Sequence, residues 1–251
     1  EVQVHTTEGV SVEGSFGEKD LQFVAYEEQS HIALQGVDVL TEPGLETLRV
    51  QLYSSEDGSP LYGFQQPVRI RNGGYPRDPV LTVPPETVEP EAVQAEQDAV
   101  DTAVSGLTME KGWNSVLSFP SQYHETFPSL FGSLRNYNDL GYNSYHSGLD
   151  LYGNEDTQVT APADGTVVLV DTLPARGQVI YIDHGWGVFT GYGHLSQVLV
   201  SAGEEVTLCQ PIAMVGSTGR VTGPHLHWEV LVGGTPVDPL EWVERTFPAE
   251  Y

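Results

Sequence analysis

Short apolar stretches separated by turn residues make up the first 85 residues of the chain. Candidate strands lie at residues 2–5, 21–25, 48–52 and 68–70, and glycines or the Asn72-Gly73-Gly74 cluster bound them. Short strands with frequent turn signals are typical of a β-sandwich. We therefore predict a small β-sandwich-like accessory domain over residues 1–85.

A different periodicity follows Pro84-Pro85. Val93, Val100 and Val104 recur at spacings near seven and four, which places them on one side of a helix. Pro90 lies in the first turn of this stretch and Gly106 lies just past its end, the order expected of a capped helix. We interpret residues 86–112 as an acidic, helical connector.

The remaining residues, 113–251, return to strand-like patterns. The clearest runs are 159–161, 165–170, 179–182, 188–192 and 225–232, separated by glycine turns and without a helix-length pattern between them. A succession of this kind favours an antiparallel sheet or flattened barrel over a βαβ fold. The predicted fold class is therefore all-β, with residues 113–251 as a second domain.

Charge and composition exclude several functions. The chain has 35 acidic and 10 basic residues, a net charge of -25, so we expect no nucleic-acid partner. Uninterrupted apolar runs reach only four residues, against about 18 needed to span a bilayer, so we expect no membrane span. The single cysteine, Cys209, cannot form an internal disulfide.

The segment His225-Leu226-His227-Trp228-Glu229 carries the most informative pattern. Alternate side chains of a strand share a face, so His225, His227 and Glu229 project together, opposite a core-facing row that includes Leu226 and Trp228. The polar row either lines a cleft or simply faces solvent. Glu229 either orients an imidazole or lies in solvent.

A second element, His146-Ser147-Gly148-Leu149-Asp150, offers an imidazole and a carboxylate four residues apart, and His194 adds another imidazole. Catalytic zinc takes three such ligands and leaves a fourth position open. Two histidines and one aspartate would hold the metal, and two further histidines would handle protons during metal-assisted hydrolysis.

Three separated motifs, His146-Ser-Gly-Leu-Asp150, Tyr192-Gly-His194-Leu195 and Ser217-Thr-Gly-Arg-Val-Thr-Gly-Pro-His225-Leu-His227, occur in this order. Together they resemble the signature of the lysostaphin-type (LytM-like) zinc endopeptidases, peptidase family M23. The resemblance covers residues 127–242 and implies a fold of the duplicated hybrid motif kind. It does not extend to residues 1–112.

The resemblance implies that His146, Asp150 and His227 hold Zn²⁺ and that His194 and His225 are the catalytic pair. It also implies peptidoglycan peptides, in cross-bridges or stems, as the substrate of an endopeptidase. A tyrosine assists the oxyanion in some relatives, and three tyrosines precede or adjoin the first ligand: Tyr137, Tyr142 and Tyr145. We expect a monomeric bacterial protein in the extracellular space or cell envelope, whose signal peptide has been removed.

Other interpretations remain open at this point. The stretch Ala161-Pro-Ala-Asp-Gly165 also resembles a lipoyl or biotinyl carrier, but a carrier needs a lysine, and none follows Lys111. A catalytically silent regulator of other wall hydrolases is the alternative on the same fold. The first domain either positions the enzyme on its substrate or covers the cleft. Four histidines are given no role in the chemistry. We expect His184 to be structural, and His5, His31 and His124 to be ordinary surface or turn residues.

Overall fold

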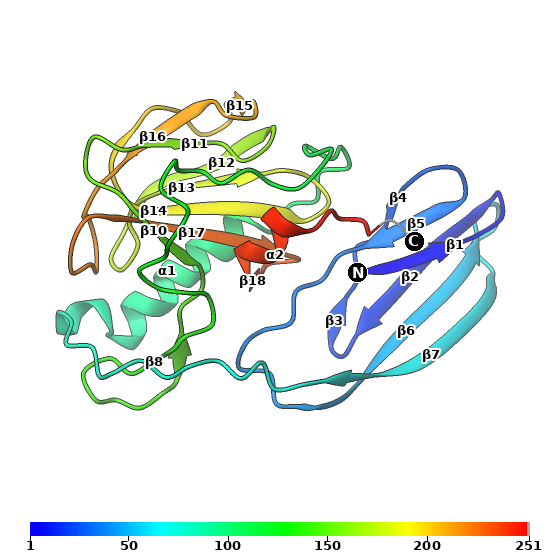
Figure 1. Cartoon of the computed structure of the whole chain (residues 1–251). Helices are drawn as coiled ribbons and strands as arrows, with labels where there is room; N and C mark the ends of the chain where they lie inside the picture. The colour runs from blue at the N-terminus through cyan, green and yellow to red at the C-terminus, as the bar shows by residue number, and fades with distance from the viewer. Residues whose placement is uncertain (250–251) are drawn as a thin grey trace.

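Strands dominate the computed structural model, which describes residues 1–249, and the predicted all-β class is confirmed (Figure 1). The helical elements in this range are η1 (Pro85–Thr87), α1 (Pro90–Ala103) and α2 (Pro239–Glu244). Pro90 at the first helical position of α1 fits the fixed backbone angle of proline. Within residues 1–249, no helix has the length and apolarity required to cross a membrane.

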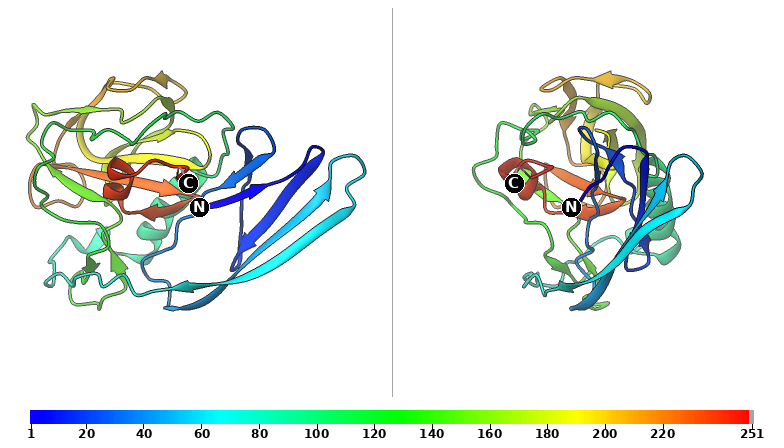
Figure 2. Two further views of the ribbon diagram at one scale, coloured as in Figure 1. Left: turned by 45° about the vertical axis from the view of Figure 1, so that its right-hand side comes forward. Right: turned by 90° about the vertical axis from the view of Figure 1, so that its right-hand side faces the viewer.

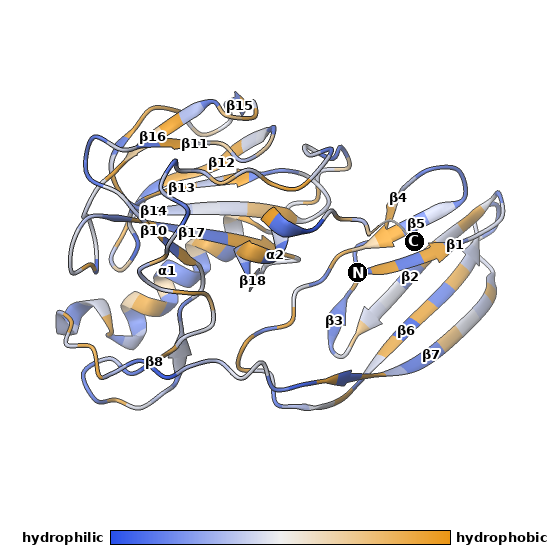
Figure 3. Ribbon diagram, in the orientation of Figure 1, coloured by the Kyte–Doolittle hydropathy of each residue, from blue (hydrophilic) through white to orange (hydrophobic). Residues whose placement is uncertain are grey.

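The N-terminal residues form two small antiparallel sheets. One has the order β1-β5-β4 and the other β3-β2-β6-β7. The longest strands of this part, β6 and β7, alternate hydrophobic and hydrophilic residues along a single hairpin (Figure 3). The strand bounds are β1 (Val2–His5), β2 (Val10–Phe16), β3 (Lys19–Asp20), β4 (Val24–Ala25), β5 (Ser30–Ala33), β6 (Gly44–Ser54) and β7 (Pro60–Ile70).

A nine-stranded sheet forms the C-terminal part, with a central order β10-β17-β14-β13-β12-β15 and all pairs antiparallel. Strands β11 and β16 pair with each other, β16 also pairs with β14, and β18 pairs with β17. A separate two-stranded sheet joins β8 to β9. The bounds are β8 (Leu134–Arg135), β9 (Ser144–Tyr145), β10 (Leu149–Tyr152), β11 (Gln158–Thr160), β12 (Gly165–Leu173), β13 (Gly177–Asp183), β14 (Val188–Val198), β15 (Glu205–Val206), β16 (Pro211–Val215), β17 (His225–Val232) and β18 (Thr235–Val237).

The two faces of β17 pack against different hydrophobic cores. Leu226 and Trp228 point into the larger hydrophobic core and are fully buried. Leu231, on the opposite face, joins a smaller core with Val100 of α1 and Phe189 of β14. His225, His227 and Glu229 lie on the same face of β17 as Leu231, because alternate residues of a strand share a face. Helix α1 packs on this face near Leu231.

The N-terminal residues pack directly against the C-terminal sheet. Ile32 of β5 is fully buried in the same core as Trp228, and the rings of Tyr26 and Trp186 meet edge to face at 5.5 Å. The backbone N–H of Gly36 donates to the carbonyl of Val232 at 3.0 Å. The division at residues 85 and 112 stays a prediction, and residues 250–251 of the third segment lie outside the described range.

Residues 76–83 run beside β8 as an extra, extended segment on the way from β7 to α1 (Figure 2). The N–H of Asp78 donates to the carbonyl of Leu134 at 3.0 Å, and the N–H of Leu81 donates to that of Asn136 at 2.9 Å. Asn138 adds two side-chain hydrogen bonds to the backbone of Val83. This segment therefore supports the β8–β9 sheet that leads into residue 146.

Candidate metal and catalytic site

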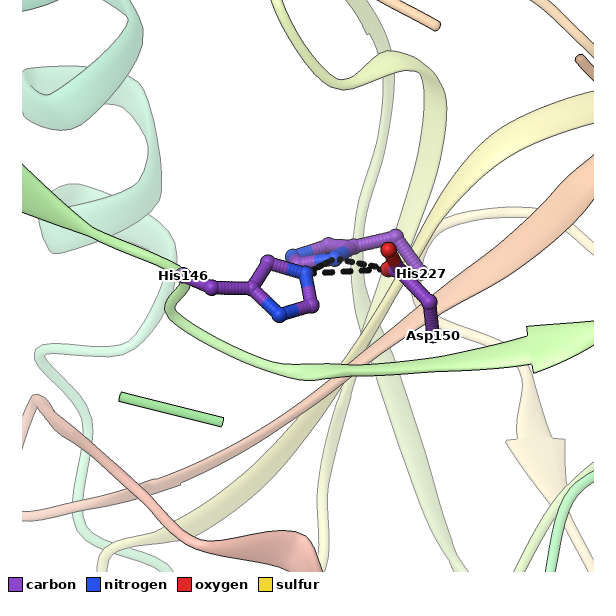
Figure 4. Close-up of side chains that lie close together, drawn as sticks. All are labelled: His146, Asp150 and His227. Carbon is purple, nitrogen blue, oxygen red and sulfur yellow. Dashed lines mark hydrogen bonds and ion pairs between the residues drawn. The ribbon is translucent and has the colours of Figure 1, made fainter. Parts of the chain in front are cut away.

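His146, Asp150 and His227 converge from two distant parts of the chain (Figure 4). His146 directly follows β9, Asp150 lies in β10, and His227 lies opposite Asp150 in the register of β17. Nε2 of His146, Oδ1 of Asp150 and Nδ1 of His227 are 2.9–3.0 Å apart. All three residues are buried, so the cluster is sheltered from bulk water.

The hydrogen bonds around the two imidazoles decide which nitrogens face the cluster. Nδ1 of His146 lies 2.9 Å from the carbonyl of Leu130, and Nε2 of His227 lies 3.2 Å from the carboxylate of Glu229. Both partners accept only, so these nitrogens carry the protons and donate them. The remaining nitrogens point toward each other and toward Asp150, an arrangement that a metal ion between them would satisfy.

The donor set fits zinc. Zinc binds histidine nitrogen and carboxylate oxygen at about 2.0–2.2 Å, and an ion can reach all three atoms of a triangle with sides of 2.9–3.0 Å. Without a metal, burial opposes a charge on His227. The carboxylates of Asp150 and Glu229 outweigh that effect and raise the pKa of His227 to about 9. Burial lowers the pKa of His146, so this imidazole is neutral.

Gly148 permits the close approach of the motif to β17. A Cβ at this position would lie 2.3 Å from the carbonyl oxygen of Trp228 and 2.9 Å from Cε1 of His227. Any side chain would push the strand or the imidazole away. The glycine between the two ligand-type residues is therefore a packing requirement of the cluster.

His194 and His225 lie beside the cluster. Their rings are 4.8 Å apart, and Nε2 of His225 lies 3.7 Å from Oδ2 of Asp150. Nδ1 of His194 bonds the carbonyl of Thr218, and Nδ1 of His225 bonds that of Gly223. In each ring Nδ1 donates to a backbone carbonyl, which leaves Nε2 as the nitrogen that can exchange a proton, and burial lowers the pKa of His194 to about 3.

Ser129, Arg135 and Asp78 connect the ring of His146 to the segment of residues 76–83. Ser129 Oγ lies 3.2 Å from its Nδ1, and Arg135 donates to that hydroxyl at 2.7 Å. Arg135 also pairs with Asp78 at 2.8 Å. An acidic residue far upstream thus fixes the arginine that borders this imidazole.

Glu229 is buried, so the solvent-facing alternative for this residue is wrong. It accepts hydrogen bonds from His227, Ser147 and Tyr181 and pairs with Arg176. Sequence reasoning missed Arg176. One signal was available, because residues 113–251 contain only four basic residues and a rare cation in an acidic chain is a candidate for an internal ion pair.

Two of the three candidate oxyanion tyrosines use their hydroxyl groups elsewhere. Tyr145 donates to Asp38 and Tyr142 donates to the carbonyl of Asp78, both at 2.7 Å. Tyr137 stacks under the guanidinium of Arg220 at 4.1 Å. None of these three contacts joins a tyrosine to the cluster.

The histidines without an assigned chemistry lie apart from the cluster. His184 is buried and bonds the carbonyl of Asp164 and the hydroxyl of Thr190, both at 2.7 Å, as a structural residue would. His5 bonds Ser30, and His124 stacks on Phe119 at the surface. His31 is partly buried in β5.

His184 makes the stability of the fold depend on pH. Burial lowers its pKa to about 4, whereas an unfolded histidine titrates near 6.5. As pH falls from about 6.5 to about 4, His184 binds a proton in the unfolded chain but not in the folded chain, so the free energy of unfolding decreases. We expect this residue alone to cost about 2 kcal/mol between about pH 7 and about pH 5.

Urea unfolding of wild type and of His184→Gln at both pH values measures that contribution. The variant is expected to lose less stability on acidification than wild type. His124→Gln, at an exposed histidine, is the control and is expected to keep the wild-type dependence. Equal losses in wild type and His184→Gln would contradict the assignment.

Comparison with known proteins agrees with the motifs. Residues 144–239 match the model of peptidase family M23. Over 96 residues, 38% of this chain, the sequence is 43% identical to the peptidoglycan DD-endopeptidase ShyA of Vibrio cholerae. Over 98 residues, 39% of this chain, it is 41% identical to the murein hydrolase activator EnvC of Escherichia coli. The resemblance to M23 peptidases is thus confirmed.

The chain covers only 22% of ShyA and 23% of EnvC, about a fifth of either relative. A crystal structure of an M23 peptidase from Pseudomonas aeruginosa matches the fold with a TM-score of 0.68 and 24% identity. The match covers 95% of this chain and 94% of that one. The overall fold, including the strands that precede α1, therefore also occurs in that protein.

Proposed function

We propose that this protein is a zinc-dependent endopeptidase that hydrolyses peptide bonds in the cross-bridges or stem peptides of bacterial peptidoglycan. His146, Asp150 and His227 hold the zinc ion, and His194 and His225 are the catalytic pair. The observation that carries the proposal is the meeting of three ligand atoms within 3.0 Å, with two further imidazoles beside them.

The chemistry follows from these groups. When bound in such a site, zinc polarises a carbonyl group and lowers the pKa of water toward about 7. His194 and His225 both use Nδ1 in a hydrogen bond to the backbone, so Nε2 of one can accept the proton of the attacking water. The other, once protonated, can donate to the leaving amine. The neutral state of His194 is favoured by its burial.

The relatives support the substrate class and also supply the alternative. ShyA and ShyB of Vibrio cholerae are named peptidoglycan DD-endopeptidases, whereas EnvC is named a murein hydrolase activator. An activator needs neither metal ligands nor proton-handling histidines, and this chain has residues suited to both roles. A secreted or envelope location follows from the proposed substrate.

Digestion of purified peptidoglycan tests the proposal. The zinc-loaded chain is expected to release fragments whose masses report a cleaved peptide bond, and removal of zinc with a chelator is expected to stop their release. Walls of several cross-link types identify the preferred bond. A zinc-loaded chain that cleaves no wall, yet stimulates a separate wall hydrolase, would favour the activator instead.

Replacing either proton-handling histidine separates catalysis from metal binding. His225→Ala and His194→Ala are expected to retain zinc and to lose turnover by about 100-fold or more, because neither imidazole belongs to the triangle of ligand atoms. Metal analysis and fragment release are measured on the same samples. A His225→Ala protein that lacks stoichiometric zinc would contradict this division of roles.

A further inference from the structure

Glu96 of α1 is an unusual residue for a connecting helix, because it is buried with an exposed fraction of 4%. Burying a carboxylate is costly unless it is paired and hydrogen-bonded. Both of its oxygens accept hydrogen bonds from one turn of the β12–β13 hairpin. Oε2 accepts the N–H of Ala175 at 2.7 Å, and Oε1 accepts Nη1 of Arg176 at 2.7 Å.

Arg176 carries this contact onward to the proposed metal site. Its guanidinium lies between two carboxylates and donates through Nη2 to Oε1 of Glu229 at 3.0 Å. The same oxygen of Glu229 accepts Nε2–H of His227 at 3.2 Å. Glu96, Arg176, Glu229 and His227 thus form one continuous, largely buried chain of charge-assisted hydrogen bonds.

Gly191 leaves room for this chain on the neighbouring strand. A Cβ at position 191 would lie 2.6 Å from the ring of Tyr181 and 3.1 Å from Oε2 of Glu229. The absence of a side chain there lets Tyr181 donate its hydroxyl proton to Glu229. The orientation of Glu229 is therefore determined by Arg176, Tyr181 and Ser147 together.

The same hairpin turn also fixes His194. The carbonyl of Arg176 accepts the backbone N–H of His194 at 2.7 Å. His194 has a φ of +63°, in the left-handed region that side chains other than glycine adopt only at a cost. The turn that Glu96 holds therefore stabilises a strained backbone at one of the two proton-handling histidines.

From these contacts we infer that Glu96 is a positioning residue of the metal site, which acts through Arg176 on His227 and on His194. The inference rests on the proposed function, because it assumes that His227 ligates a metal. It makes α1 part of the working site, although the helix lies outside residues 144–239, which match the M23 model. Partners that orient a ligating histidine change metal affinity by about 10- to 100-fold when they are removed.

Zinc affinity of the full chain, measured by competition with a chelator at fixed pH, tests the inference. Glu96→Gln is expected to bind zinc about tenfold more weakly than wild type. Glu91→Gln removes the same charge from an exposed position of the same helix and is expected to bind like wild type. The visible absorption of the cobalt(II)-substituted Glu96→Gln protein is expected to shift, because it reports the coordination geometry of the metal.

A double-mutant cycle separates action through Glu229 from a general loss of stability. If Glu96 acts through this carboxylate, the Glu96→Gln, Glu229→Gln double variant binds zinc no more weakly than Glu229→Gln alone. Arg176→Lys keeps the charge but loses the planar fork that serves two carboxylates, so it is expected to weaken zinc binding like Glu96→Gln. This second variant keeps the test decisive if Glu96→Gln does not fold.

The outcomes distinguish two failures. Wild type that binds one zinc ion, with Glu96→Gln and Arg176→Lys within about twofold of its affinity, would overturn the positioning role and leave the proposed function intact. Fully additive losses in the double-mutant cycle would also overturn it. Wild type without zinc affinity would overturn both proposals.

Discussion

Asp150→Ala is expected to abolish zinc binding and peptide hydrolysis together. The carboxylate lies 2.9 Å from Nε2 of His146 and 3.0 Å from Nδ1 of His227, so in the proposed zinc site it is the anionic ligand between two imidazoles. Its removal leaves two imidazoles, fewer than the three protein ligands of a catalytic zinc site. Activity is expected to fall to the uncatalysed background, the largest effect of any single substitution considered.

Metal analysis after dialysis and fragment release from peptidoglycan measure the two losses. Asp156→Ala, at an exposed aspartate beyond the same strand, is the matched control and is expected to keep both zinc and activity. An Asp150→Ala protein that retains a full zinc equivalent would show that the metal is held elsewhere.

Removal of residues 1–112 is expected to prevent cooperative folding of residues 113–251. The truncation removes Ile32 and Val24 from the larger hydrophobic core and exposes the side chains of residues 113–251 that pack against them. It also deletes the edge-to-face contact of Tyr26 with Trp186. It also leaves Arg176 without its partner Glu96 and Arg135 without Asp78. A buried charge that loses one partner destabilises a protein by about 3–5 kcal/mol.

The truncated and full chains are compared by urea unfolding with zinc removed. Two substitutions in the full chain serve as calibration. Ile32→Ala is expected to cost about 2–5 kcal/mol, whereas Val37→Ala at an exposed site is expected to cost less than about 0.5 kcal/mol. A truncated chain that unfolds as cooperatively as the full chain, at similar urea, would contradict the shared core.

Strand β17, which carries His227, could be predicted from the sequence because its signal is local, whereas β10, which carries Asp150, was not among the predicted strands. The alternation of His225 to Val232 determines which side chains share a face, and β17 places Leu226 and Trp228 in the core as predicted, although His227 and Glu229 on its other face are buried as well. Pro90 and the valine spacing likewise predict a helix, and α1 covers Pro90–Ala103. Periodicity of this kind is a property of neighbouring residues alone.

The hydrogen-bonded chain of Glu96, Arg176 and Glu229 could not be predicted, because it depends on contacts between distant residues. Glu96 and Arg176 are 80 positions apart, and Arg176 and Glu229 are 53 apart. As a result, the buried Glu96 has the same local sequence signal as an exposed acidic residue of a helix. The extent of β6 and β7 was also missed, since a hairpin that is largely exposed needs no continuous apolar run.

The contacts of the N-terminal residues with the C-terminal sheet bear on the role of this part of the chain. Positioning the substrate and covering the cleft were the two hypotheses for this part, and both remain proposals. The core shared by Ile32 and Trp228, and the support of β8 by residues 76–83, favour a further role in building the peptidase fold itself. Variants of the full chain are therefore better tests of either hypothesis than a truncated one.

Anomalous X-ray diffraction at the zinc edge, from crystals of the full chain grown with zinc, is the most direct test of the metal site. We predict a single strong peak about 2.0–2.2 Å from Nε2 of His146, Oδ1 of Asp150 and Nδ1 of His227. Zinc-containing crystals with no peak among these three atoms, or with zinc bound only at surface carboxylates, would contradict the proposed site and the hydrolysis that depends on it.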